Sequence, residues 1–385
     1  MPENKDNKIL NVPNLRFPEF EGEWEEHYLS DYLDFKNGLN PKPERFGKGI
    51  RFISVMDILN NAVITNDCIR ASVDVSEEEL LSFCVENGDI LFQRSSETLE
   101  DVGRANVYMD NKPAVFGGFV IRGKKKAEYD PLFFRYLLAS PFARKKIIPM
   151  GAGAQHFNIG QEGLNKVKLH FALLDEQKKI ARLLSLLDER IAIQNKIIEK
   201  LETLIKGLRV HLTQKTDGYI VYLSEIAKIY QPQTISLSEF TEEGYLVYGA
   251  NGIIGKYREY NHRTEQICIT CRGNTCGMVN YTKPKSWITG NAMIVNTDDY
   301  QDKICKRYLY HYLSTYNFNS IISGSGQPQI VRSPLEKLKV KLPAILKQKQ
   351  IATFLDKFQN QIEINNNILH LYLQQKQYLF RQMFI

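Results

Sequence analysis

Two forty-residue stretches, 175–214 and 346–385, carry the same regular alternation of apolar and polar positions. Apolar residues recur at alternating steps of four and three, starting at Ile180 in the first stretch and at Ile351 in the second. An average step of about 3.5 residues predicts the buried seam of a coiled coil. Neither stretch contains a proline or more than one glycine. Each is therefore expected to form one helix of roughly 60 Å, at about 1.5 Å per residue.

The second stretch repeats the first at a constant shift of 171 positions, which pairs Gln177 with Gln348. The same shift pairs Gln194 with Asn365, the first polar breaks in the two apolar series. If the helices pair antiparallel, these two side chains should meet near the middle of each helix. A polar pair in a coiled-coil seam can fix register at some cost in stability.

The blocks that precede the two helices also repeat in their order of elements, although their residues differ widely. Each block opens on Tyr-Leu-Ser followed by an acidic residue, and each continues with a short apolar strand, ending at Arg94 in one and Arg272 in the other. A glycine-rich loop, 150–159 or 323–330, then precedes a last strand. A shared order with divergent loops predicts two related domains with different binding surfaces.

We therefore expect an α+β fold with two pseudo-symmetric globular domains, separated by two long antiparallel coiled-coil helices. The expected boundaries are 1–172 for the first domain, 173–215 for the first helix, 216–343 for the second domain and 344–385 for the second helix.

Composition adds little to this picture. A chain of 385 residues with 43% apolar content suits two or three ordinary domains. The formal charge is +6, but the two helical stretches hold +5 of it, so charge favours nucleic acid only weakly. There is no run of 18 apolar residues, and the N-terminal sequence MPENKDNKIL is too polar for a signal peptide. We expect a cytoplasmic protein without a membrane segment.

Several enzyme motifs are missing from the sequence. Without a Pro-Pro dipeptide there is no Asn/Asp-Pro-Pro-aromatic loop of the kind that holds a flipped adenine for methylation. The phosphate-binding Gly-x4-Gly-Lys-Ser/Thr motif is missing too. Cys268 and Cys271 are three positions apart in a predicted strand, which points them to opposite faces and argues against zinc. We expect no catalytic residues, no metal and no cofactor.

The repeated unit of globular block, last strand and helix resembles the specificity subunits of type I restriction–modification systems. The resemblance rests on the duplication, on the helix starts DEQKKIA and LKQKQIA, and on the opening NVPNLRFPEFEGEWEEHYLSDY at 11–32. It covers essentially the whole chain. It implies that each block is a target recognition domain for one half of a bipartite sequence in double-stranded DNA. It also implies that the helices dock two methyltransferase subunits, which methylate adenine, and that nuclease-translocase subunits join to cut DNA.

Polar and basic residues at strand ends and in the glycine-rich loops are the candidate DNA contacts. Arginine can bond guanine O6 and N7, and glutamine can pair with adenine. In the first block the candidates are Gln93, Arg94, Ser95, Arg104, Gln155, His156 and Asn158. In the second block they are Arg258, Arg272, Asn274, Gln327 and Gln329.

Each candidate also has a purely structural interpretation. An arginine at a strand end can be a salt-bridged part of the scaffold, and the short polar residues can be turn formers. The glycine-rich loops can be connectors into the last strand. For the whole chain, the competing hypothesis is a coiled-coil adaptor that never touches DNA. The side chains Arg94, Arg272, Gln155 and Gln327 argue against the adaptor, because the order of elements places them at equivalent positions in the two blocks.

Overall fold

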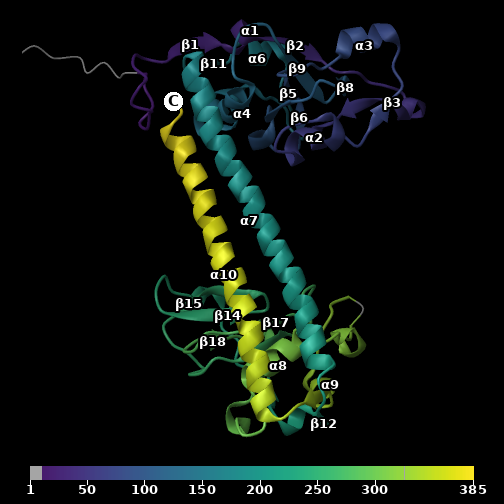
Figure 1. The fold of residues 1–385 in the computed structure, drawn as a ribbon, viewed down its shortest axis with the longest axis vertical. Helices are drawn as coiled ribbons and strands as arrows, with labels where there is room; N and C mark the ends of the chain where they lie inside the picture. Colours follow the sequence, from purple (N-terminus) through teal and green to yellow (C-terminus); the bar gives the residue numbers. More distant parts are fainter. Residues whose placement is uncertain (1–10, 325) are drawn as a thin grey trace, which may run out of the picture. The chain divides into compact units, whose positions relative to one another are not determined.

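Two long helices run through the structure (Figure 1). The computed structural model describes residues 11–324 and 326–385 of the chain. In it, α7 spans Leu174–Gln214 and α10 spans Ile345–Gln382. The two long helices predicted from the apolar periodicity are confirmed.

Contacts divide the chain into two compact units. The first comprises the chain up to Ile193 together with Leu369–Ile385, and the second comprises Gln194–Ile368. Each unit thus contains one globular block and about half of each long helix. The helices are consequently packed against the blocks along much of their length.

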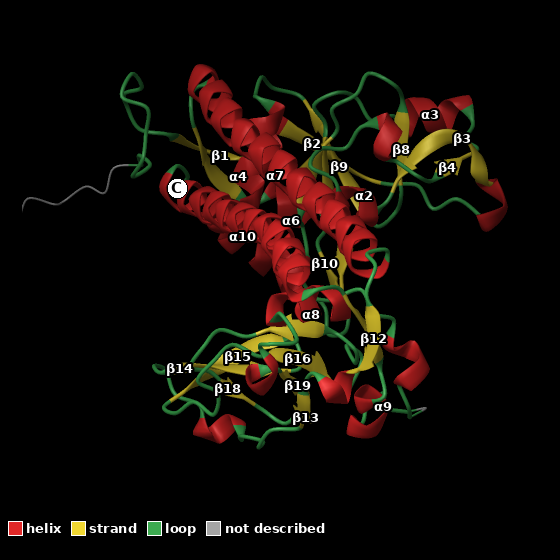
Figure 2. Ribbon diagram, turned by 60° about the horizontal axis from the view of Figure 1, so that its bottom comes forward, coloured by secondary structure: helices red, strands yellow, loops and turns green. Residues whose placement is uncertain are grey.

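The first unit is built around a four-stranded antiparallel sheet and a smaller three-stranded sheet (Figure 2). The four-stranded sheet has the order β2 (Leu33–Asn37), β9 (Val120–Lys125), β5 (Ile90–Gln93), β7 (Ala105–Val107). The three-stranded sheet has the order β4 (Ser72–Val73), β3 (Phe46–Ile53), β8 (Ala114–Phe116). Two short pairs complete the strands: β1 (Glu25–Tyr28) with β11 (Lys168–Phe171), and β6 (Ser95–Ser96) with β10 (Phe157–Asn158). The short helices are α1 (Leu29–Tyr32), α2 (Val55–Asn60), α3 (Glu77–Phe83), α4 (Pro131–Ala139), α5 (Pro141–Ile147) and α6 (Gln161–Asn165).

The second unit contains the same kinds of sheet. Its four-stranded sheet has the order β13 (Lys228–Tyr230), β19 (Ala292–Asn296), β16 (Ile267–Thr270), β17 (Val279–Tyr281). Its three-stranded sheet has the order β15 (Gly252–Tyr257), β14 (Tyr245–Gly249), β18 (Trp287–Ile288). A further pair joins β12 (Tyr219–Tyr222) to β20 (Lys339–Leu342), and the short helices are α8 (Lys306–Leu313) and α9 (Arg332–Glu336).

The two sheet systems correspond strand by strand. In both, the central strand of the four-stranded sheet, β5 or β16, is antiparallel to both of its neighbours. In both, one pair of the small sheet is parallel: β3 with β8, and β14 with β18. This shared mixture of pairings confirms the predicted repeat of an α+β domain.

The two central strands are buried on both faces. Ile90 and Phe92 of β5 face the large core cluster of their unit, whereas Leu91 faces a separate one. In β16, Ile269 and Cys268 are divided between two clusters in the same way. Side chains alternate across a strand, so a continuous apolar run is what burial on both faces requires.

The long helices supply part of each core. In the first unit, Leu184 of α7 packs with Leu379 of α10 and with Phe384 beyond its end. In the second, Ile205 of α7 packs with Leu355 of α10. Full burial of one such side chain contributes about 1.5–3 kcal/mol, so the apolar seam joins each block to both helices.

A repeated glutamine fastens the start of each long helix to its block. Gln177 accepts a hydrogen bond from the Asp130 backbone N–H at 3.0 Å and donates to the Ala172 carbonyl at 2.8 Å. Gln348 accepts one from the Cys305 N–H at 2.8 Å and donates to the Pro343 carbonyl at 2.9 Å. Both glutamines are buried. The glutamine shared by the two helix starts therefore has a structural role.

The polar breaks in the seam are hydrogen-bonded. Gln194 Nε2 donates to Asn365 Oδ1 at 2.7 Å, which confirms the predicted meeting of these two side chains. Further along α7 in the same unit, Arg209 Nη2 donates to Gln359 Oε1 at 2.8 Å. As the residue number rises on α7 it falls on α10, so the two helices pair antiparallel.

Among the residues that the structure describes, no helix is long and apolar enough to cross a membrane. The first ten residues, on which the expected absence of a signal peptide rests, lie outside this part of the chain.

Candidate nucleic-acid interface

Three loops converge beyond the end of β5 in the first unit. The glycine-rich loop reaches back to this strand end, where Asn158 pairs with Ser95 and the Ile159 N–H donates to the Arg94 carbonyl at 2.9 Å. The β8–β9 turn joins them, because the Arg94 N–H donates to the Phe119 carbonyl at 2.9 Å. The strand end, the glycine-rich loop and this turn therefore form one surface.

The second unit repeats this backbone arrangement. The Ile330 N–H donates to the Cys271 carbonyl at 3.0 Å, and the Cys271 N–H donates to the Asn291 carbonyl at 3.1 Å. Gln329 forms a bridge with Arg272. Ser325, in the same glycine-rich loop, lies outside the described residues.

These pairings correct the correspondence inferred from the sequence. Arg272 faces Gln329 as Ser95 faces Asn158, so Arg272 corresponds to Ser95. Arg94 then corresponds to Cys271. Matching by residue type paired Arg94 with Arg272. The backbone hydrogen bonds instead pair Arg272 with Ser95, the residue that follows Arg94.

The same correction applies to the glycine-rich loops. The bridge between Ala152 and Asn158 has its counterpart between Ser323 and Gln329, again at a shift of 171. His156 therefore corresponds to Gln327, and Gln155 corresponds to a glycine. The predicted equivalence of Gln155 and Gln327 was therefore wrong by one position, and this pair no longer argues against the adaptor hypothesis.

In the first block, the candidates closest to the strand end are partly built into the scaffold. Gln93 is buried, and its Nε2 donates to the Ser95 carbonyl at 3.0 Å. Arg94 is half-buried, and its Nη1 donates to the Gly118 carbonyl at 3.2 Å. The Ser95 hydroxyl bonds to the Asn158 side chain. These contacts order the loops.

The other candidates of the first block are exposed to solvent. Gln155, His156 and Asn158 all lie at the surface of the glycine-rich loop. Arg104 is also exposed, and its guanidinium pairs with Asp101 at 2.6 Å. Their donors and acceptors can reach a ligand without unpacking the core.

In the second block, four candidates lie on the same surface. Arg272 and Asn274 follow β16, and Gln327 and Gln329 belong to the glycine-rich loop; all four are exposed. Arg258 lies elsewhere, because it follows β15 in the three-stranded sheet, where it is exposed and 3.7 Å from Glu259. The structure thus brings four of the five candidates together by backbone pairing.

An exposed aromatic residue that was not among the predicted contacts lies on the first block's surface. Phe119 is 69% exposed and lies in the turn that bonds to Arg94. With Met56 it lines a largely apolar cavity of about 400 Å³. A Cβ on the preceding Gly118 would lie 2.0 Å from Asn40 Oδ1, so a larger residue there would displace the Asn40 side chain.

The cysteines of the second block are separated by the sheet. Cys268 and Cys271 belong to different core clusters, which confirms that they point to opposite faces. Burial raises the pKa of both thiols, so they are protonated at neutral pH. Within the described ranges, no three His, Cys, Asp or Glu side chains are placed to hold a metal ion.

Comparison with known proteins agrees with the repeat. Residues 21–203 and 219–371 each match the type I restriction modification DNA specificity domain. The chain is 25% identical over 395 aligned positions to the putative type I restriction enzyme MjaX specificity subunit of Methanocaldococcus jannaschii, covering 93% of this chain and 92% of the relative. It is 35% identical over 149 residues to the EcoprrI specificity subunit of Escherichia coli, an overlap of 37% of this chain and 36% of that one.

Solved structures show the same fold. The type I restriction–modification S subunit from M. genitalium superposes with a TM-score of 0.67 at 16% identity, over 97% of this chain and 99% of that one. A chain from a structure that addresses complex assembly and conformational transition of the type I system superposes with a TM-score of 0.55 at 14% identity, over 93% and 96%. The similarity therefore extends over both blocks and both helices.

Proposed function

The chain belongs to the type I restriction–modification DNA specificity family, and on that premise we propose that it reads a bipartite target in double-stranded DNA. As a specificity subunit it carries no catalysis of its own. Each block contacts one half of the target through the surface formed by its strand end, its turn and its glycine-rich loop. The recognition domains are 1–172 and 216–343, and the helical segments 173–215 and 344–385 connect and space them.

The observation that carries this proposal is the contrast between backbone and side chains at the two surfaces. The same hydrogen bonds hold the loops in both blocks, yet Cys271 replaces Arg94, Arg272 replaces Ser95 and Gln327 replaces His156. A common scaffold that carries different donors and acceptors suits the reading of two different base sequences.

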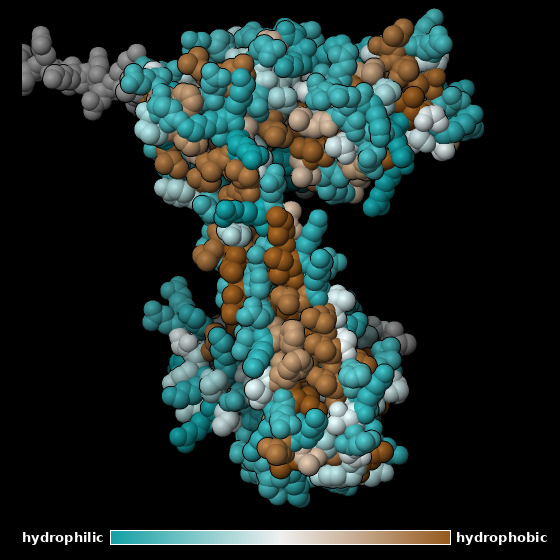
Figure 3. Space-filling model, viewed as in Figure 1, coloured by the Kyte–Doolittle hydropathy of each residue, from teal (hydrophilic) through white to brown (hydrophobic). Residues whose placement is uncertain are grey.

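The long helices carry the second part of the proposal, the docking of two methyltransferase subunits. Ile193 on α7 is 57% exposed, and Ile364, its equivalent on α10 at the shift of 171, is 49% exposed. Figure 3 shows hydrophobic residues along the exposed faces of the long helices. Other exposed apolar residues on these helices are Leu186, Ile197, Leu204, Val210, Leu346, Phe354, Leu371, Leu373 and Tyr378.

Exposed apolar residues on both helices, with one pair at equivalent positions, support a partner that binds each helix. We infer that each helix receives one methyltransferase copy, and that nuclease-translocase subunits join the assembly for cleavage. The cytoplasm, where chromosomal DNA is accessible, is the compartment that this function requires.

Exchange of one block tests the proposal. Residues 21–172 are replaced by the matching segment of a related subunit, the chimera is expressed with its methyltransferase, and adenine methylation is mapped by single-molecule sequencing of the host genome. One half of the methylated sequence should change while the other half and the spacing stay the same. A change in both halves of the methylated sequence would contradict separate reading by the two blocks. If the chain were an adaptor without DNA contacts, the methylated sequence would stay the same.

A further inference from the structure

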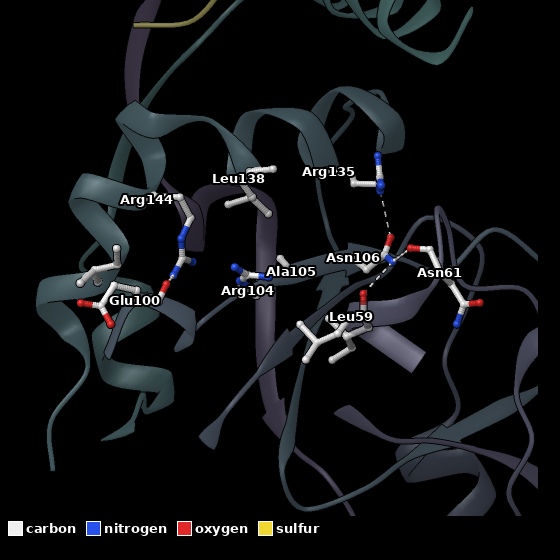
Figure 4. A pocket seen from close by; sticks show the side chains of 12 residues that line it. Leu59, Asn61, Glu100, Arg104, Ala105, Asn106, Arg135, Leu138 and Arg144 are labelled. Atoms are coloured by element: carbon white, nitrogen blue, oxygen red, sulfur yellow. Dashed lines mark hydrogen bonds between the residues drawn. The ribbon is translucent and has the colours of Figure 1, made fainter. Parts of the chain in front are cut away.

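A cavity of about 360 Å³ lies in the first block (Figure 4). Its apolar wall includes Leu59 and Leu138. Three arginines line it: Arg104 at the start of β7, Arg135 on α4 and Arg144 on α5. Cationic side chains against an apolar wall favour an anionic ligand, because weak solvation strengthens charge-assisted hydrogen bonds.

The positive charge in this cavity is only partly compensated. Asp101 pairs with Arg104 at 2.6 Å, but both side chains are more than one-third exposed. Asp188 lies 3.7 Å from Arg135 and is shared with Lys376, which approaches it to 2.6 Å. One carboxylate therefore serves two cations. Glu100, a carboxylate that lines the cavity itself, is exposed.

Arg144 has hydrogen bonds but no ion pair among the described residues. Its Nη2 donates to the carbonyls of Glu100 and Val102 at 2.8 and 2.7 Å. Its Nη1 is buried and has no partner within the described part of the chain. Burial, together with the nearby Arg104, lowers the pKa of Arg144 to about 10. Because Nη1 has no accessible surface, an anion in the cavity would act on Arg144 through its charge, by offsetting the repulsion from Arg104.

The second block has a cavity at the equivalent place, with a volume of about 430 Å³. Backbone hydrogen bonds give the correspondence. The Gln93 N–H donates to the Arg104 carbonyl as the Thr270 N–H donates to that of Met278, so Met278 replaces Arg104. Since Gln177 and Gln348 bind equivalent helix starts, Tyr310 replaces Arg135. The fold therefore forms the cavity without these two arginines.

We propose that the cavity of the first block binds a phosphate group through Arg104 and Arg135, with the buried guanidinium of Arg144 adding positive charge to the cavity wall. The group belongs either to the DNA backbone or to a free phosphate-bearing anion. Leu59 and Leu138 supply the apolar wall beside the ligand.

Phosphate binding can be measured on the full chain alone. Inorganic phosphate is titrated calorimetrically at constant ionic strength into the wild type and into R104M and R104M/R135Y, which install the residues of the second block. Wild type should bind one phosphate saturably, R104M should bind it about tenfold more weakly because a charge-assisted bond is lost, and the double variant should show no binding. R70M, which removes an exposed arginine outside the cavity, is the matched control and should bind as wild type does. No saturable binding to wild type, or equal binding by R104M, would overturn the proposal.

R104M also separates folding from binding, since the Arg104 side chain is 55% exposed and its loss should leave the thermal transition unchanged. Titration of a short duplex distinguishes the two sources of the phosphate. For a backbone phosphate, R104M should reduce the slope of log K against log salt by about one, and phosphate should compete with DNA. An unchanged slope, with phosphate binding intact in the wild type, assigns the cavity to a free anion. The site does not rest on the DNA-reading function, because phosphate binding is measured without DNA.

Discussion

Arg94 and Arg272 show how one residue type acquires different roles in equivalent loops. Arg94 occupies the position of a buried cysteine in the other block, and its guanidinium donates to the Gly118 carbonyl. Arg272 occupies the position of Ser95 and is exposed beside Gln329. We therefore expect Arg272 to contact DNA directly, and Arg94 to contribute to binding partly by ordering the loop that contains Gly118.

Replacing each arginine by alanine tests this difference. Arg272→Ala should weaken binding to the target by about 1–3 kcal/mol and relax discrimination in one half-site, if the guanidinium is bidentate to guanine. The melting temperature should stay the same. Arg94→Ala should also lower the melting temperature, because the half-buried guanidinium donates to the Gly118 carbonyl. Binding to variant target duplexes gives the discrimination, and an equal loss for all sequences after Arg272→Ala would indicate a phosphate contact instead.

His311 predicts a pH dependence of the second unit. This side chain is fully buried, its Nε2 lies 2.8 Å from Asp356 Oδ1, and Arg209 and Arg307 lie nearby. Burial lowers the pKa of His311 below its usual value of 6.5, so the folded state holds the neutral ring. Below pH 6.5 the unfolded chain binds the proton more readily, and stability should fall as the pH falls from there through the folded-state pKa.

The measurement is the melting temperature of the wild type and of His311→Gln between pH 7.5 and 5. The variant should be less stable at pH 7.5 but should lose less stability on acidification. His262, also buried with a lowered pKa, stays in both proteins and so cancels in the comparison. Parallel curves for the two proteins would exclude His311 as a source of the acid sensitivity.

At the scale of elements, local periodicity predicted the helices but could not predict the loop pairings. The step of 3.5 residues identifies α7 and α10 because helical contacts repeat every few residues along the sequence. The pairing of Ser95 with Asn158 joins residues 63 positions apart. No local pattern fixes such a register, and this is why matching by residue type placed Arg272 opposite Arg94, one residue from its structural equivalent Ser95.

The pair formed by Gln194 and Asn365 gives a prediction about the seam. Both partners are hydrogen-bonded, and Gln194 is 7% exposed. Replacing both by leucine should raise the melting temperature, because a satisfied but partly desolvated polar pair gives way to apolar packing. Gln194→Leu alone should cost about 1–3 kcal/mol, since the Asn365 amide oxygen loses its donor.

The double variant should also methylate targets of more than one spacer length, if the polar pair fixes the helix register. Thermal unfolding gives the first outcome, and mapping of methylated sites gives the second. A stabilised variant with unchanged spacing would show that the pair contributes only to stability. A destabilised double variant would mean that leucine does not fit the seam.

For the whole molecule, duplication supplies two recognition surfaces on one chain, and the helices supply the connection between them. Each compact unit includes about half of α7 and half of α10. A change in helix length must therefore occur in both helices if the apolar seam is to be kept. A single insertion would shift the residues of one unit against their partners on the other helix.

Adding one heptad to each helix, after Gln194 in α7 and before Asn365 in α10, keeps the apolar series in step. The insertion adds about 10 Å at about 1.5 Å per residue. With base pairs stacked at about 3.4 Å, the spacer of the preferred target should lengthen by about three base pairs, while both half-sites stay the same.

Four residues added to α7 alone lengthen that helix by about 6 Å and locally unwind the coiled coil. This variant should favour a spacer longer by one or two base pairs, with weaker selectivity. Methylated-site sequencing measures both variants. A spacer that does not change in the paired-heptad variant, with the half-sites still read, would show that something other than the helices sets the separation of the half-targets.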